Sequence, residues 1–144
     1  MSDPKTNVGK IFKSLEKYFD PGAGKIKVKS RPVLVIGYEK NATSYFNIDY
    51  ETLPISSLGN IDPDPEFDIL ISQETQSKLG LTKTSYIRTH KTSWNNCKNM
   101  AIDNEIGDLK GEFPGLFEEL LKLNEKWVSE RNSINLIKTQ ESVS

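Results

Sequence analysis

A cluster of cations directly before an aliphatic segment is the first feature of this chain that could do chemistry. Residues 25–31 contain three lysines and Arg31 with no acidic residue among them, which gives a charge of +4. Residues 33–36 then read Val-Leu-Val-Ile, the pattern of a strand buried on both faces. A run of charges is most often a solvated loop, but cations held beside a rigid strand could also bind an anion. These residues alone leave both interpretations open.

Other common sites that handle phosphates or metals do not fit the sequence. The segment "GAGK", residues 22–25, ends like a phosphate-binding loop, but Phe19 stands where that loop needs glycine and Ile26 where it needs serine or threonine. One histidine, His90, and one cysteine, Cys97, cannot form a zinc site by themselves. The sequence therefore predicts no metal and no cofactor.

The elements that must position the cations begin with an expected N-terminal helix over about residues 5–19. Apolar residues there recur at helical spacing: Val8, Ile11, Phe12, Leu15, Tyr18 and Phe19. The segment "KIKVKS" alternates lysine with Ile26 and Val28, as in a half-solvated strand or a long arm. Alternation over residues 44–50 predicts a further strand, and residues 68–72 predict another short one.

Two more helices are expected after these strands. Residues 72–80, "SQETQSKLG", begin with a capping serine and end in glycine, which predicts a short middle helix. Residues 114–131 carry an apolar stripe at helical spacing and predict a C-terminal helix. The polar residues 132–144 are expected to form a flexible tail.

The order of these elements defines the expected fold class. Several short strands, over about residues 24–110, precede a closing helix without a strand–helix–strand rhythm. We therefore predict a single α+β domain over residues 1–144, built on a small antiparallel β-barrel with helices at its edge. A chain of 144 residues is long enough to bury a core of this kind.

Composition and charge limit the classes of function. The net charge of −1 argues against a general nucleic-acid coat, although the charges are segregated, with −4 over residues 62–68. There is no apolar run near 18 residues, and the first ten residues have no apolar core of a signal peptide. We therefore expect a cytoplasmic protein without a membrane partner.

Four segments, taken in order, resemble the PemK/MazF-like toxins, the ribonucleases of toxin–antitoxin pairs. "KSRPVLVIG" resembles their arginine–proline strand, and "LPISS" their second motif. "KLGLTKTSYIRTHKT" and "EIGDLKGE" resemble the passages that follow, so that the likeness covers about residues 24–127. The chain departs from the family in its expected N-terminal helix and in lacking a glycine–glutamate pair before the arginine. The resemblance implies an SH3-like β-barrel, a homodimer and a neutralising antitoxin protein.

The resemblance also implies an activity, the metal-independent cleavage of single-stranded RNA. By position in the motifs, Arg31 and Ser56 correspond to the catalytic arginine and hydroxyl of the family, with Ser57 as the alternative hydroxyl. A guanidinium offers a planar set of donors to the charged phosphorane and cannot lose its proton, so it can stabilise that transition state. His90 is the candidate general acid, since an ordinary histidine pKa suits proton transfer near neutral pH.

Further residues are candidates for binding RNA. Lys25, Lys27 and Lys29 would follow the backbone of a single strand as a basic arm. Ser57, Arg88 and Lys91 are candidate contacts to the phosphates as well. The structural alternatives are an ordinary edge-strand cation for Arg88 and a satisfied structural histidine for His90.

Two other functions are compatible with the same residues. A non-catalytic barrel could bind protein or nucleic acid, and a relative of the gyrase poisons could act on a topoisomerase. Convergence of Arg31 and Ser56 in one cleft would favour the nuclease. Pairing of Arg31 with Asp49 or Glu51 would favour a structural role instead.

Overall fold

The computed structural model describes residues 3–41, 43–59 and 62–143, with side chains as far as residue 133. A short 3-10 helix, Pro4–Asn7, comes first. The strands are β1 (Lys10–Asp20), β2 (Lys25–Tyr38), β3 (Asp49–Ser57), β4 (Asp68–Leu70), β5 (Ser85–Arg88), β6 (Ser93–Asn96) and β7 (Gly107–Asp108). The helices are α1 (Gln73–Lys78), α2 (Leu109–Glu112) and α3 (Pro114–Val143), and a 3-10 turn covers Cys97–Asn99.

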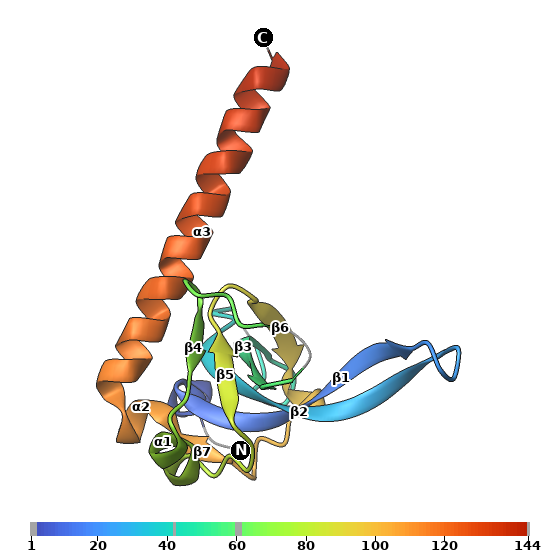
Figure 1. The fold of residues 1–144 in the computed structure, drawn as a ribbon, viewed down its shortest axis with the longest axis vertical. Helices are drawn as coiled ribbons and strands as arrows, with labels where there is room; N and C mark the ends of the chain where they lie inside the picture. Colours follow the sequence, from blue (N-terminus) through green and yellow to red (C-terminus); the bar gives the residue numbers. More distant parts are fainter. Residues whose placement is uncertain (1–2, 42, 60–61, 144) are drawn as a thin grey trace.

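The fold is α+β, with a curled antiparallel sheet in the form of a half-barrel and a long C-terminal helix (Figure 1). The sheet has the order β4-β5-β3-β2-β1-β7, and β6 pairs with β3 off this path. All strand pairs are antiparallel. Within the described residues, no helix is both long enough and apolar enough to cross a membrane.

The curled sheet buries side chains on both of its faces. One apolar cluster contains Ile11 and Leu34, and lies on the side covered by α2 and α3. The other contains Phe12 and Val33, and lies on the side of Tyr50 and Met100. Because successive side chains of a strand point to opposite faces, neighbouring residues of β1 and β2 enter different clusters.

The predicted N-terminal helix is wrong, because residues 10–20 form strand β1. β1 pairs with β2 over its full length, from Ile11 opposite Leu34 to Asp20 opposite Lys25. The misleading signal has a physical cause. Ile11 and Phe12 are both fully buried, one on each face of the sheet, so the alternation typical of a half-buried strand is absent.

The outer halves of β1 and β2 form a hairpin that projects from the body of the protein (Figure 1). We call residues 13–31 the arm. The segment "DPGAG" turns the hairpin: Gly24 has φ +65°, a conformation that favours glycine, and its N–H donates to the Asp20 carbonyl at 2.8 Å. The expected long arm at "KIKVKS" is thus present, and it continues directly into the buried part of β2.

β4 and α1 lie close to their predicted positions, whereas one more predicted strand begins later than expected. The predicted strand over residues 44–50 begins only at Asp49. Before it, the hydroxyl of Ser44 accepts a hydrogen bond from the Phe46 N–H at 3.2 Å, and this local turn replaces strand pairing. β4 lies within the predicted residues 68–72, and α1 begins after its capping residue Ser72.

Helix α3 runs past its predicted end at residue 131, to Val143. The chain has no glycine or proline after Gly115, so nothing in its sequence stops the helix. The expected flexible tail over residues 132–144 is therefore helical as far as Val143, whereas its side chains beyond residue 133 and all of Ser144 lie outside the described residues. Near its middle, α3 is anchored by the buried Asn124, whose Nδ2 donates to the Thr89 carbonyl at 2.9 Å.

Candidate functional site

The pairing of β2 with β3 brings Arg31 and Ser56 to the same place. Val33 lies directly opposite Pro54, and directly opposed residues of an antiparallel pair share a face of the sheet. Arg31 lies two residues before Val33, and Ser56 lies two residues after Pro54, so both are on that same face and at the same end of the pair. The pairing of β2 with β3 ends at Val33 and Pro54, and from there β2 belongs to the arm.

Arg31 and Ser56 line one pocket of about 330 Å³, which we call the Arg31 pocket. A volume of this order is at the lower end of the range for small-ligand sites. Two more predicted residues, Arg88 and Lys91, line it as well. The other lining residues are Ser14, Glu16, Val33, Pro54, Ser93 and Asn95.

Arg31 is paired with a carboxylate that the sequence did not suggest. Its Nε lies 2.9 Å from an Oε of Glu16, and both side chains are about half exposed. Arg31 also lines the Arg31 pocket, where a guanidinium can present further donors to a phosphate. Arg31 does not pair with Asp49 or Glu51, the arrangement that would have favoured a structural role.

A network of neutral polar groups holds one wall of the pocket. Asn95 on β6 donates from Nδ2 to the Ser14 hydroxyl at 3.1 Å. Its Oδ1 accepts from the buried Thr52 hydroxyl at 2.6 Å and from the Ser93 hydroxyl at 3.1 Å. Because the amide is held at both ends, it fixes the distance between β1 and β6 beside Arg31.

Arg88 has a structural partner behind the pocket. Its Nε lies 3.2 Å from Oδ1 of Asp68, whose side chain is fully buried. The other carboxylate oxygen of Asp68 accepts the Asp64 N–H at 2.7 Å. The pair thus neutralises a buried charge, while Arg88 also reaches the pocket lining.

The three lysines on the outer half of β2 point along the same face as Arg31. Each second residue of β2 shares a face, so Lys25, Lys27 and Lys29 form a row that leads outward from Arg31. We call these three residues the basic row. Lys29 lies over the ring of Tyr18, with its Nζ 4.6 Å from the centroid.

One member of the basic row is held by an acidic side chain. Nζ of Lys27 lies 2.7 Å from an Oδ of Asp20. This hydrogen bond and those from the turn backbone lower the pKa of Asp20 below its ordinary value. Within the described residues, Lys25 has no such ion pair.

The structure places His90 outside the Arg31 pocket. The imidazole lies between the rings of Phe67 and Trp127, with centroid distances of 5.6 Å and 5.9 Å. Its Nδ1 is buried without a hydrogen-bond partner among the described residues, and the nearest carboxylate oxygen, on Asp68, is 3.7 Å away. Burial lowers the pKa of His90 below its usual 6.5.

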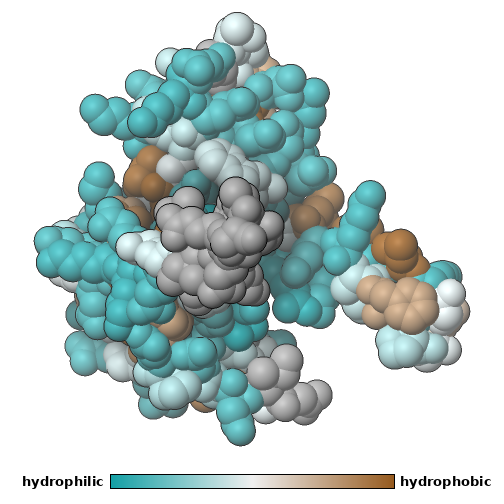
Figure 2. All heavy atoms as spheres, turned by 90° about the horizontal axis from the view of Figure 1, so that it is seen from above, coloured by the Kyte–Doolittle hydropathy of each residue, from teal (hydrophilic) through white to brown (hydrophobic). Residues whose placement is uncertain are grey.

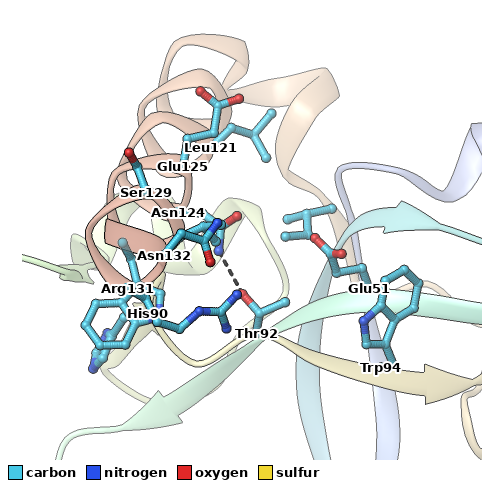
Figure 3. A pocket seen from close by; sticks show the side chains of 13 residues that line it. Glu51, His90, Thr92, Trp94, Leu121, Asn124, Glu125, Ser129, Arg131 and Asn132 are labelled. Carbon is cyan, nitrogen blue, oxygen red and sulfur yellow. Dashed lines mark hydrogen bonds between the residues drawn. The ribbon is translucent and has the colours of Figure 1, made fainter. Parts of the chain in front are cut away.

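His90 lines a different and larger hollow, of about 950 Å³, which we call the helix groove. Figure 3 shows residues of α3 on one side of the helix groove, and Glu51 and Trp94 of the sheet on the other. Ser57 lies at the exposed end of β3 and does not line the Arg31 pocket. Ser56 rather than Ser57 is therefore the hydroxyl beside Arg31.

Sequence reasoning missed Glu16 and Asn95. Glu16 was assigned to a helix, and a helix gives it no relation to Arg31. The hairpin turn at "DPGAG" was the available signal, because a hairpin centred there places Glu16 opposite Lys29 and diagonal to Arg31. Asn95 gave no local signal, since its position depends on the pairing of β6 with β3.

Comparison with known proteins adds no identification. No protein-family model matches this chain, and no curated protein is significantly similar to it.

Proposed function

We propose that this protein is a metal-independent endoribonuclease that cleaves single-stranded RNA. Its chain would be a PemK/MazF-like toxin with a small SH3-like barrel, neutralised by an antitoxin protein and acting as a homodimer. The single observation that supports the activity most is the shared pocket of Arg31 and Ser56. The order of the four resembling segments is the independent support for the family.

The geometry supports a specific role for each group in the pocket. The Glu16 carboxylate takes the proton of the 2′-OH, and the 2′-oxygen attacks the adjacent phosphorus. The bond from phosphorus to the 5′-oxygen breaks, and that oxygen takes a proton from solvent, which reaches the half-exposed pair. The products are a 2′,3′-cyclic phosphate and a free 5′-hydroxyl.

Charge stabilisation comes from the cations around the reacting phosphate. The terminal nitrogens of Arg31 face the phosphorane oxygens, and Lys91 adds a second positive charge from the turn after β5. Ser56 donates its hydroxyl to a phosphate oxygen and so fixes the position of the scissile bond. His90 has no part in this scheme, since it lies in the helix groove.

The test is cleavage of a single-stranded RNA in the presence of EDTA, with analysis of the product ends. We expect Arg31→Ala to lower the rate by about 100-fold or more, as loss of a preorganised donor does in other sites. Glu16→Gln should lower it by a similar factor, of the order contributed by general base catalysis. Lys122→Ala, on an exposed turn of α3, is the matched control and should cleave like the wild type.

Two results would contradict the proposal. The first is cleavage that needs magnesium, and the second is equal cleavage by the wild type and Arg31→Ala. A wild type that binds RNA without cutting it would favour the non-catalytic barrel instead. Induction of wild type and Arg31→Ala in cells, with growth and mRNA integrity followed, tests the toxin part separately.

A further inference from the structure

The arm is amphipathic, with its two faces sorted by chemistry. The strand register places Phe19 opposite Ile26, Lys17 opposite Val28, and Leu15 opposite Ser30, all on one face. Four large apolar side chains lie there and are exposed: Leu15, Phe19, Ile26 and Val28. We call these four residues the apolar face of the arm. The basic row, Arg31 and Glu16 occupy the opposite face.

Within the described residues, no other part of the chain covers the apolar face. Phe19 is 62% exposed and Ile26 is 68% exposed, near the tip of the arm. Figure 2 shows the arm standing clear of the body, with apolar side chains gathered on its outer part. A two-stranded hairpin is only marginally stable in water unless its apolar face packs against something. A partner is therefore needed to cover this face.

The helix groove is a second surface that the described residues leave open. Its walls carry apolar side chains from both α3 and the sheet, namely Ile36, Trp94, Leu121, Trp127 and Val128. Glu51 and Glu125 also line the groove, and neither makes an ion pair within the described part of the chain. Burial without a cationic partner raises the pKa of Glu51 above its ordinary value.

The charges of these two surfaces are complementary. Over residues 13–31 the arm has six cations and two acids, a net charge of +4. The helix groove is lined by two acids, Glu51 and Glu125, and by one cation, Arg131, which gives a charge of −1 with His90 neutral. Lys17 lies on the same side of the arm as the apolar face, because it is opposite Val28. Glu51 and Trp94 are directly opposite each other on the groove wall. Packing of two apolar faces against each other would bring like charges together, whereas an arm in the groove brings opposite charges together.

We propose that the arm of one protein molecule docks by its apolar face into the helix groove of a second copy, and that the exchange is reciprocal. The arm cannot fill the groove of its own chain, because it projects from the body away from α3 (Figure 1). A two-fold arrangement uses each surface twice and leaves neither uncovered. Lys17 then meets the carboxylate of Glu51. This interface rests on the homodimer of the proposed function and names its contact surfaces, but it does not rest on the nuclease activity.

The test is the oligomeric state by sedimentation velocity over a range of concentrations. We expect a dimer for the wild type, and at least a tenfold weaker dimer for Phe19→Ser. Phe46→Ser is the matched control, because Phe46 is 67% exposed but belongs to the loop before β3, outside the arm, and does not line the groove. Circular dichroism of each variant checks that the fold is retained.

A charge exchange tests the specific contact. Lys17→Glu and Glu51→Lys should each weaken the dimer about tenfold, and the double variant should regain most of the loss. A wild type that stays monomeric, a dimer unaffected by Phe19→Ser, or failure of the double variant to recover would overturn the proposal. A monomer that binds anionic lipid vesicles through Phe19 would also overturn it, in favour of a membrane surface.

Discussion

Glu16 and Arg31 acquire a joint role only because two strands place them diagonally on one face. The distance of 2.9 Å between the carboxylate and Nε keeps the guanidinium turned toward the pocket. A partly exposed pair of this kind adds little to stability, since water screens it. In the proposed nuclease, the pair would serve to orient the guanidinium, because a planar donor set is useful only when it is aimed at the phosphate.

His90 makes a pH-dependent contribution to stability at the residue scale. Its pKa in the folded protein is lowered by burial, whereas in the unfolded chain it keeps the usual 6.5. As the pH falls below about 6.5, the unfolded chain binds the proton first, so the free energy of unfolding decreases. Denaturation in urea at pH 7 and at pH 5 measures this effect. The free energy of unfolding should decrease less between these two pH values for His90→Gln than for the wild type.

The comparison of His90→Gln with the wild type isolates the titration of one imidazole, because the chain has a single histidine. Asp68 and Asp64 oppose the shift, whereas Arg88 and Lys91 add to it, and all four remain in the variant. Parallel pH profiles for the two proteins would contradict a lowered pKa for His90.

At the scale of elements, α3 is fastened to the sheet by polar contacts as well as by its apolar side chains. Asn124 donates to the Thr89 carbonyl at 2.9 Å and to the Thr92 hydroxyl at 2.7 Å, the second of which appears in Figure 3. Lys126 pairs with Glu66 in the acidic segment before β4. These contacts hold α3 against the turn between β5 and β6, so they also set the width of the helix groove.

Asn124→Ala should lower the free energy of unfolding by about 1 to 3 kcal/mol, because the buried Thr89 carbonyl loses its donor. Urea denaturation measures this change. Glu118→Ala is the control on the same helix: it removes an exposed pair with Lys122 and should change stability by less than about 1 kcal/mol. Equal losses in the two variants would show that Asn124 does not anchor the helix.

At the scale of the whole molecule, the charge is divided between the projecting arm and an acidic body. A chain with a net charge of −1 can therefore bind a polyanion through one part only. The basic row continues the line of Arg31 outward, and single-stranded RNA that enters the Arg31 pocket would lie along it. In the two proposals made above, RNA would use the basic face of the arm and a second protein copy its apolar face.

Replacement of Lys25, Lys27 and Lys29 by alanine should reduce the salt dependence of RNA binding. Each lost phosphate contact lowers the slope of log K against log salt by about 0.7, or about 2 for all three. RNA with 2′-O-methyl sugars serves as the probe, since it lacks the attacking hydroxyl. A slope equal to that of the wild type would place the RNA elsewhere, and Lys122→Ala is the control.

The sequence by itself determined the local features of this protein. Continuous apolar residues marked the buried part of β2, and alternating lysines marked its exposed part, because burial and exposure follow directly from side-chain hydropathy. Capping and turn residues located α1 within a few positions, since they act on the backbone of their immediate neighbours. Only the resemblance to the toxins identified Arg31 and Ser56 as a pair of catalytic candidates.

Tertiary structure decided which residues meet. β1 looked helical because the neighbouring residues Ile11 and Phe12 are buried on opposite faces, and that depends on a sheet curled around two clusters. Glu16 lies beside Arg31 because of the register of the β1–β2 hairpin, and His90 lines the helix groove because α3 packs near the end of β5. Local sequence carries no record of such pairings, because the register of a sheet is set by all of its strands together.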